Sequence, residues 1–161
     1  MIILIVSAWY AWRYCKTSID PDISMFLLWT MTGSVYGRDF VDCKSPGIHL
    51  WFLLLSKLVG KNVTRIRFAH HFIMGSFGLV VYGMTGNFWV GLAFTILINS
   101  GWLLAFHGNV GQIPAALLTV ALLTDQPWLA VVMGALAVAF EPKLIVVFAI
   151  LAAVQGWWQA A

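Results

Sequence analysis

Residues 88–106 read FWVGLAFTILINSGWLLAF, a predominantly apolar run in which no residue carries a charge. A run of this length and hydropathy is typical of a helix surrounded by lipid. The whole chain agrees, because 61% of its residues are hydrophobic and 9% are charged, whereas about a quarter of an ordinary soluble domain is charged. With 9 Trp and 11 Phe in 161 residues and a mean hydropathy of +0.90, a soluble core of this length cannot bury the apolar surface. The sequence therefore predicts an integral membrane protein and excludes a soluble enzyme, a disordered tail and a secreted disulfide scaffold.

Further apolar segments recur on both sides of this run. We expect helices over residues 1–14, 48–59, 68–84, 88–106, 113–123, 128–140 and 144–158. Residues 23–32 form a shorter apolar segment inside a polar loop, which predicts a helix lying at the membrane interface. The expected architecture is all-α and polytopic, a single module over residues 1–161 with six or seven transmembrane or half-spanning helices. Because several segments are shorter than the roughly 20 residues of a full span, they indicate half-spanning helices around a wet cavity or, alternatively, a plain helical hairpin.

The basic residues indicate topology rather than a nucleic-acid partner. The net charge is +3, but the 9 basic residues are spread between apolar segments and form no patch the size of a nucleic-acid groove. Four of them gather in residues 57–67 without an acidic residue, which predicts a cytoplasmic turn: Lys57, Lys61, Arg65 and Arg67. The first loop, residues 15–47, is then expected on the external face of a membrane, which we take to be a bacterial inner membrane.

Charged residues are concentrated in this first loop, which holds four of the six acidic residues of the chain. Ionisable groups are costly beside lipid, so their clustering marks a candidate site. The candidates are Asp20, Asp22, Arg38, Asp39, Asp42 and Lys44. A carboxylate here can accept a proton from a hydroxyl, and Arg38 and Lys44 can neutralise a phosphate, which together point to a phosphate-bearing lipid headgroup. The alternative is a solvated loop whose charges pair among themselves.

Histidines at the edges of apolar segments form a second group of candidates. His49 opens an apolar segment beside the charged loop, where it contacts a phosphate or, alternatively, caps the helix. His70 and His71 are adjacent in one helix and point about 100° apart, so they do not form a metal pair on one face. We expect them in interfacial packing or lipid contact. Gly75 and Gly78 in the same helix predict close helix packing.

One motif carries a family resemblance. Residues 33–47 read GSVYGRDFVDCKSPG, follow the short interfacial segment and lead into an aromatic-rich helix. This region resembles the N-terminal part of the GT-C glycosyltransferases, which include lipid A aminoarabinose transferases and protein O-mannosyltransferases. The family typically carries Asp-Lys-Pro-Pro-Gly here, and DCKSPG at residues 42–47 is similar, with Ser45 in place of the first proline. Weaker similarity continues through GNVGQIP at residues 108–114 and FEPK at residues 140–143.

The resemblance covers about residues 19–158 and implies transfer of a sugar from a polyprenyl-phosphate donor to a lipid or glycan acceptor at the external membrane face. It implies Asp20 as the catalytic base, with Asp22 as the alternative. Arg38 and Lys44 would lie beside the donor phosphate, and supporting roles fall to Asp39, Asp42 and His49. Four neighbouring carboxylates are compatible with a divalent cation, although their spacing does not require one.

The length of the chain leaves two function classes open. Enzymes of this type are much longer, so the chain corresponds to the N-terminal membrane module without the usual C-terminal part. It is therefore a compact transferase or, alternatively, a non-catalytic GT-C-derived subunit that packs against partner membrane subunits. The charged loop favours catalysis, whereas the short length favours the structural subunit.

Overall fold

The all-α class predicted from the sequence is confirmed by the computed structural model, which describes residues 1–16, 21–39, 46–100 and 111–156. Within these ranges no β-strand forms. The helices are α1 (Ile2–Tyr14), α2 (Pro21–Thr32), α3 (Pro46–Val59), α4 (Val63–Thr85), α5 (Phe88–Ile98), α7 (Gln112–Leu123), α8 (Pro127–Phe140) and α9 (Ile145–Gln155), with a 3-10 turn, η2 (Pro142–Leu144), before α9. Each predicted apolar segment therefore contains a helix.

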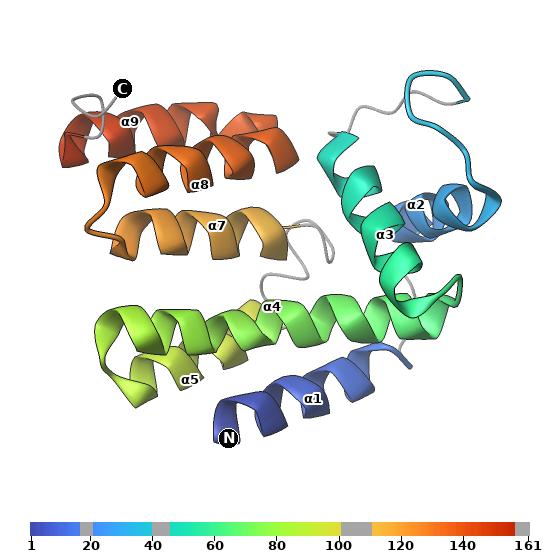
Figure 1. Ribbon diagram of the computed structural model, residues 1–161, viewed down its shortest axis with the longest axis horizontal. Coiled ribbons are helices and arrows are strands. Elements are labelled where there is room, and N and C mark those ends of the chain that lie inside the picture. The colour runs from blue at the N-terminus through green and yellow to red at the C-terminus, as the bar shows by residue number, and fades with distance from the viewer. Residues whose placement is uncertain (17–20, 40–45, 101–110, 157–161) are drawn as a thin grey trace.

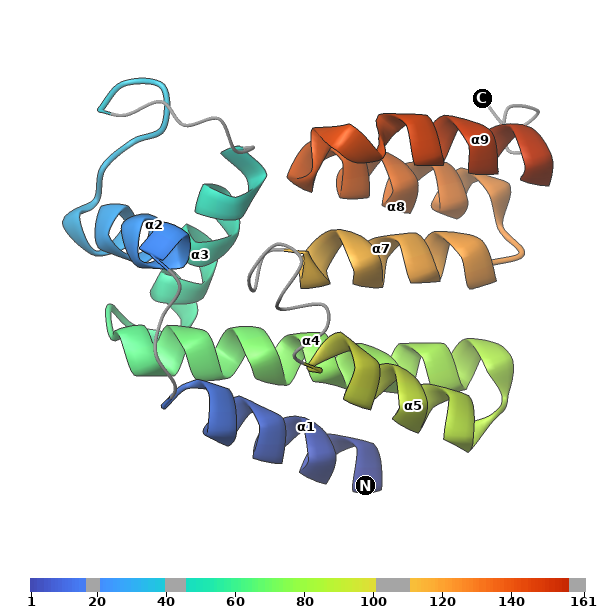
Figure 2. The same cartoon turned by 180° about the vertical axis from the view of Figure 1, so that it is seen from behind.

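Helix α4 is the longest element, at 23 residues, and lies at the centre of the bundle. It packs against α1 and α5 on one side and against α7 on the other, with α8 and α9 stacked outward from α7 (Figure 1). Helices α2 and α3 pack on each other near the N-terminal end of α4, as the reverse view in Figure 2 also shows. Helix α4 thus contacts α1, α3, α5 and α7, and it carries His70, His71 and Arg67, which are described below.

Helix α4 begins earlier than the sequence predicts. The helices expected over residues 48–59 and 68–84 leave residues 60–67 as a turn that holds Lys61, Arg65 and Arg67, but the helix starts at Val63. The cause is Asn62, whose side-chain oxygen accepts a hydrogen bond from the backbone N–H of Arg65 at 3.1 Å and so caps the first turn. Arg65 and Arg67 therefore belong to the helix and not to a loop.

Helix α5 ends earlier than predicted, at Ile98, so residues 88–106 do not form one continuous helix. Two polar side chains at this end bond back to helix carbonyls: the Asn99 amide donates to the Thr95 carbonyl at 3.2 Å, and the Ser100 hydroxyl donates to the Leu97 carbonyl at 2.7 Å. Such local bonds compete with continued helix formation. Residues 101–110 of the predicted helix lie outside the described ranges.

Small residues allow α1, α4 and α5 to approach closely, as Gly75 and Gly78 predict. A Cβ atom on Gly75 would lie 2.7 Å from Nδ2 of Asn99 and 2.8 Å from Oγ of Ser7, and one on Gly78 would collide with the Thr95 side chain. The Thr95 hydroxyl donates to the Gly75 carbonyl at 2.9 Å, a bond that this short separation permits. The predicted close packing is therefore confirmed, and a larger residue at either position would push the helices apart.

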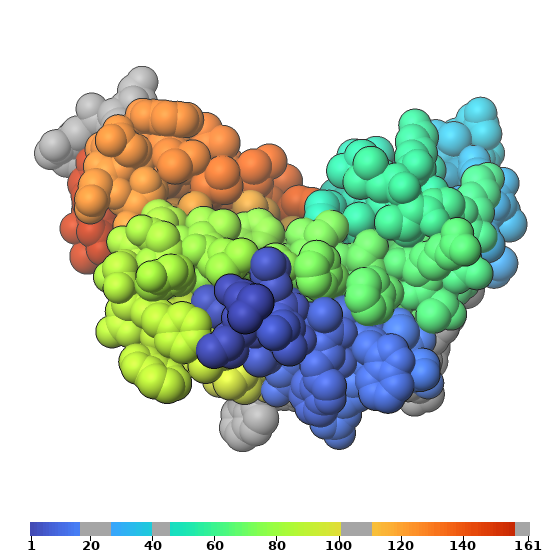
Figure 3. All heavy atoms as spheres, turned by 60° about the horizontal axis from the view of Figure 1, so that its bottom comes forward, coloured from blue at the N-terminus to red at the C-terminus, as the bar shows by residue number. Residues whose placement is uncertain are grey.

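A large apolar surface remains on the outside of the bundle. Helix α1 lies on the outside of α4 and α5 (Figure 3) and leaves Trp12 54% exposed, while Trp89 on α5 is 72% exposed and Val154 on α9 is 76% exposed. Among the described residues, no single helix has both the length and the hydropathy that crossing a bilayer requires. Apart from α4, these helices are 11 to 14 residues long.

Candidate functional site

The charged-loop site predicted from the sequence is described only in part. Arg38 and Asp39 lie in the turns that follow α2, Asp22 is the second residue of α2, and His49 lies in the first turns of α3. The remaining candidates, Asp20, Asp42 and Lys44, lie outside the described residues. The structure therefore brings together Arg38 and Asp39, and it assigns His49 a separate position that is described below.

Arg38 and Asp39 form a bidentate ion pair. The Arg38 Nε and Nη2 groups donate to the two carboxylate oxygens at 2.9 and 2.8 Å, and the same carboxylate accepts the backbone N–H of Val35 at 2.7 Å. The hydrogen bond from Arg38, followed by that from Val35, lowers the pKa of Asp39 to about 2, and the carboxylate raises the pKa of Arg38. A phosphate approaching Arg38 would have to compete with a carboxylate that is already bound.

His49 lines a cavity between the loop after α2 and the first turns of α3. The cavity has a volume of about 260 Å³, and its lining includes Ser34, Tyr36 and Leu53. The imidazole is 2% exposed. Its side chain forms a hydrogen bond with the backbone of Ser34, another residue of the cavity lining. The structure therefore places His49 in the wall of a cavity beside the charged loop, and its supporting role stays a prediction.

A buried polar chain that the sequence reasoning missed crosses the centre of the bundle. Trp51 Nε1 donates to His70 Nδ1 at 3.0 Å, His70 Nε2 lies 2.9 Å from Gln112 Oε1, and Gln112 Nε2 donates to the Ile98 carbonyl at 2.6 Å. Because an indole nitrogen only donates, His70 Nδ1 must accept, and the imidazole proton therefore lies on Nε2. The chain joins α3, α4, α7 and the end of α5.

The expectation that His70 and His71 contact lipid or pack at an interface is wrong. Their exposed fractions are 1% and 0%, and their rings lie 5.2 Å apart in edge contact. His71 also stacks on Tyr14 of α1, with ring centroids 5.2 Å apart. The two histidines are buried because α4 is covered by α1, α3, α5 and α7 along this stretch. A sequence signal for the buried polar chain did exist, since Gln112 is a polar residue at the start of the mostly apolar helix α7.

The end of α1 is tied to the start of α4. Arg67 is 5% exposed and donates from Nη1 to the Cys15 carbonyl at 3.2 Å. The sequence predicts opposite membrane faces for the start of the first loop and the basic segment, whereas this hydrogen bond places Cys15 and Arg67 at the same end of α4. In the described ranges, no three His, Cys, Asp or Glu side chains gather as a metal-binding group.

Comparison with known proteins adds no relative: no family model, no curated protein and no solved structure matches the chain. The GT-C resemblance therefore depends on the motifs of the sequence itself, chiefly those of the charged loop.

Proposed function

We propose that the chain is an integral membrane protein that transfers a sugar from a polyprenyl-phosphate donor to a lipid or glycan acceptor, as its resemblance to GT-C glycosyltransferases implies. The observation that carries this proposal is the His49 cavity at the position where the resembling motif begins, because its lining residue Val35 donates a backbone hydrogen bond to the Asp39 carboxylate of the Arg38–Asp39 pair. Lipid as the surrounding medium is supported by the apolar faces that remain exposed on α1, α5, α8 and α9. In this proposal no short helix crosses the bilayer by itself, and the helices occupy it as packed half-spanning elements.

In this mechanism Asp20 is the general base that deprotonates the acceptor hydroxyl, with Asp22 as the alternative. The hydroxyl oxygen attacks the anomeric carbon, and the bond from that carbon to the donor phosphate breaks. Lys44 and Arg38 stabilise the charge on the departing phosphate. Because Asp39 binds Arg38 through two hydrogen bonds, it holds the guanidinium in a fixed orientation while part of its charge is neutralised. Asp42 is proposed to orient Lys44 or the acceptor, and a divalent cation would assist the same phosphate.

The proposal is tested first by lipid retention. We expect detergent-purified protein to retain a polyprenyl phosphate in native mass spectrometry, and Lys44→Ala to weaken retention by about tenfold to a hundredfold, the worth of a hydrogen bond to a charged group. Lys57→Ala is the matched control, because Lys57 is an exposed lysine outside the charged loop. Equal loss in both variants, or no retention by the wild type, contradicts the proposal.

The catalytic step is tested separately with a labelled polyprenyl-phosphate sugar. Asp20→Asn keeps the shape of the side chain and removes the base, so lipid retention should persist while sugar transfer falls by at least about a hundredfold. If transfer is unchanged in Asp20→Asn, the same measurement on Asp22→Asn decides whether the alternative base is used. Unchanged transfer in both variants excludes an aspartate base in this segment.

A second function, that of a non-catalytic subunit, is favoured by one specific observation. Helices α8 and α9 leave large apolar side chains exposed, including Trp128 at 60% and Val146 at 62%. Such a surface fits the transmembrane helices of partner subunits as well as it fits lipid. Co-purification of other membrane proteins in a fixed ratio, together with the absence of polyprenyl-phosphate retention, would establish this alternative.

A further inference from the structure

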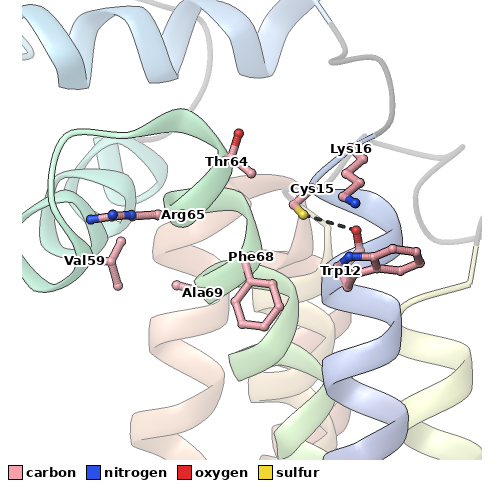
Figure 4. Close-up of a pocket in the computed structure, with 8 residues that line it drawn as sticks. All are labelled: Trp12, Cys15, Lys16, Val59, Thr64, Arg65, Phe68 and Ala69. Atoms are coloured by element: carbon pink, nitrogen blue, oxygen red, sulfur yellow. Dashed lines mark hydrogen bonds between the residues drawn. The ribbon is translucent and has the colours of Figure 1, made fainter.

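A second cavity, of about 460 Å³, opens between the end of α1 and the start of α4. Its walls are apolar, with Trp12 contributed by α1, Phe68 by α4 and Val59 by the end of α3 (Figure 4). Two basic residues, Lys16 and Arg65, also line it, and its lining contains no acidic residue. None of these residues takes part in the sugar transfer proposed above.

The two cations flank the apolar wall. The Lys16 ammonium lies 4.2 Å from the centroid of the Trp12 ring, a cation–π contact that keeps the charge beside the cavity. In Figure 4, Arg65 extends from α4 on the side of the cavity away from Lys16, with Phe68 between them. Among the described residues, the one ion pair is Arg38–Asp39, so no described carboxylate neutralises Lys16 or Arg65.

We propose that this cavity binds an anionic phospholipid of the surrounding bilayer. The headgroup phosphate lies beside the Lys16 ammonium, Arg65 adds positive charge on the other side of the cavity (Figure 4), and an acyl chain lies along Trp12 and Phe68. Charge complementarity selects this occupant, because basic pockets between helices attract anionic headgroups. The apolar wall favours a lipid over free phosphate, since an acyl chain packs against Trp12 and Phe68 and inorganic phosphate does not. Trp9, three residues before Trp12 on α1, is also 48% exposed.

The test measures retention of phosphatidylglycerol against phosphatidylcholine by native mass spectrometry of the purified chain. The wild type should retain one phosphatidylglycerol in preference to phosphatidylcholine. The double variant Lys16→Gln/Arg65→Gln should weaken that binding by about twenty-five-fold, because each basic residue near an anionic lipid contributes about fivefold. Both side chains are exposed, so the fold should survive. The matched control is Lys57→Gln/Lys143→Gln, which removes two exposed lysines outside the cavity.

A second variant, Ala69→Phe, fills the apolar part of the cavity without changing a charge and should also reduce retention. The proposal is overturned if the wild type shows no preference for phosphatidylglycerol, or if the control pair lowers binding as much as the cavity pair. It is equally overturned if these variants lose polyprenyl phosphate and not phosphatidylglycerol. Failure here is distinguishable from failure of the proposed transferase, because that function depends on Lys44 and Asp20 and not on Lys16 and Arg65.

Discussion

Replacing Gln112 with leucine should destabilise the protein far more than its small change in volume suggests. The side chain is 0% exposed and joins His70 to the Ile98 carbonyl through contacts of 2.9 and 2.6 Å. Leucine removes both bonds and leaves the His70 Nε2–H group and the Ile98 carbonyl buried without these partners. Each orphaned group costs about 1–3 kcal/mol, so we expect the free energy of unfolding to fall by about 2–6 kcal/mol. Because whole domains are stable by only about 5–15 kcal/mol, this is a large fraction of the total.

The assay is denaturant titration of the protein in detergent micelles, followed by far-ultraviolet circular dichroism. The matched control is Gln155→Leu, which makes the same chemical change at an exposed residue at the end of α9. That variant should change the free energy of unfolding by less than about 0.5 kcal/mol. If Gln112→Leu behaves like Gln155→Leu, the buried polar chain contributes nothing measurable and our reasoning is refuted.

A double-mutant cycle tests whether the chain acts as a unit. Trp51→Phe removes the indole donor to His70 Nδ1 and leaves an aromatic ring in place. Since Trp51 and Gln112 both bond to the same imidazole, their effects should be coupled by about 0.5–3 kcal/mol. Strict additivity of the two single variants would show that the two hydrogen bonds are independent.

Three further predictions concern other described residues. Gly78→Ala should lower the free energy of unfolding by about 1–3 kcal/mol in the same denaturation assay. The control is Gly83→Ala, where an added Cβ meets no atom within 4 Å, and it should raise the free energy of unfolding by about 0.5–1 kcal/mol. Equal effects of the two variants would contradict the close packing of α4 and α5. The Asp39 carboxyl should titrate with a midpoint near its pKa of about 2 by nuclear magnetic resonance, and the midpoint should rise in Arg38→Gln. Because that folded-state pKa is depressed, the contribution of the pair is present above the unfolded-state pKa of about 3.9 and is lost as pH falls toward 2. The nitrogen chemical shifts of His70 should show the Nε2–H tautomer, and an Nδ1–H tautomer would exclude the hydrogen bond from Trp51.

The helices were predictable because each is a continuous apolar segment, but their ends were not. Residues 113–123 and 128–140 of the prediction agree closely with α7 and α8, which are bounded by turn residues. The start of α4 and the end of α5 differ because single side chains, Asn62 and Asn99, bond to the local backbone. Such hydrogen bonds depend on the rotamer of one side chain, and a hydropathy profile of the sequence does not show them.

The charged loop was identifiable from its composition, and the contact of Arg38 with Asp39 joins neighbours in the chain. The buried polar chain was not identifiable, because His70 and Gln112 are 42 positions apart and come from different helices. Two adjacent histidines in one helix point in different directions, so the sequence predicts that at least one is on the surface. Both are buried here because α4 is covered on several sides. Their burial is a property of packing around α4 and not of their own segment.

The amino-acid sequence by itself determined the helical class, the number and order of the apolar segments, the excess of apolar surface and the concentration of charge in the first loop. These are local or additive properties, so composition and spacing are sufficient to predict them. The tertiary structure alone decided that Trp51, His70 and Gln112 meet in the core, that Arg67 bonds to the end of α1, and that Lys16 and Arg65 flank one cavity. Each of these contacts joins helices far apart in the chain, and only the packing of side chains against one another determines which helices become neighbours.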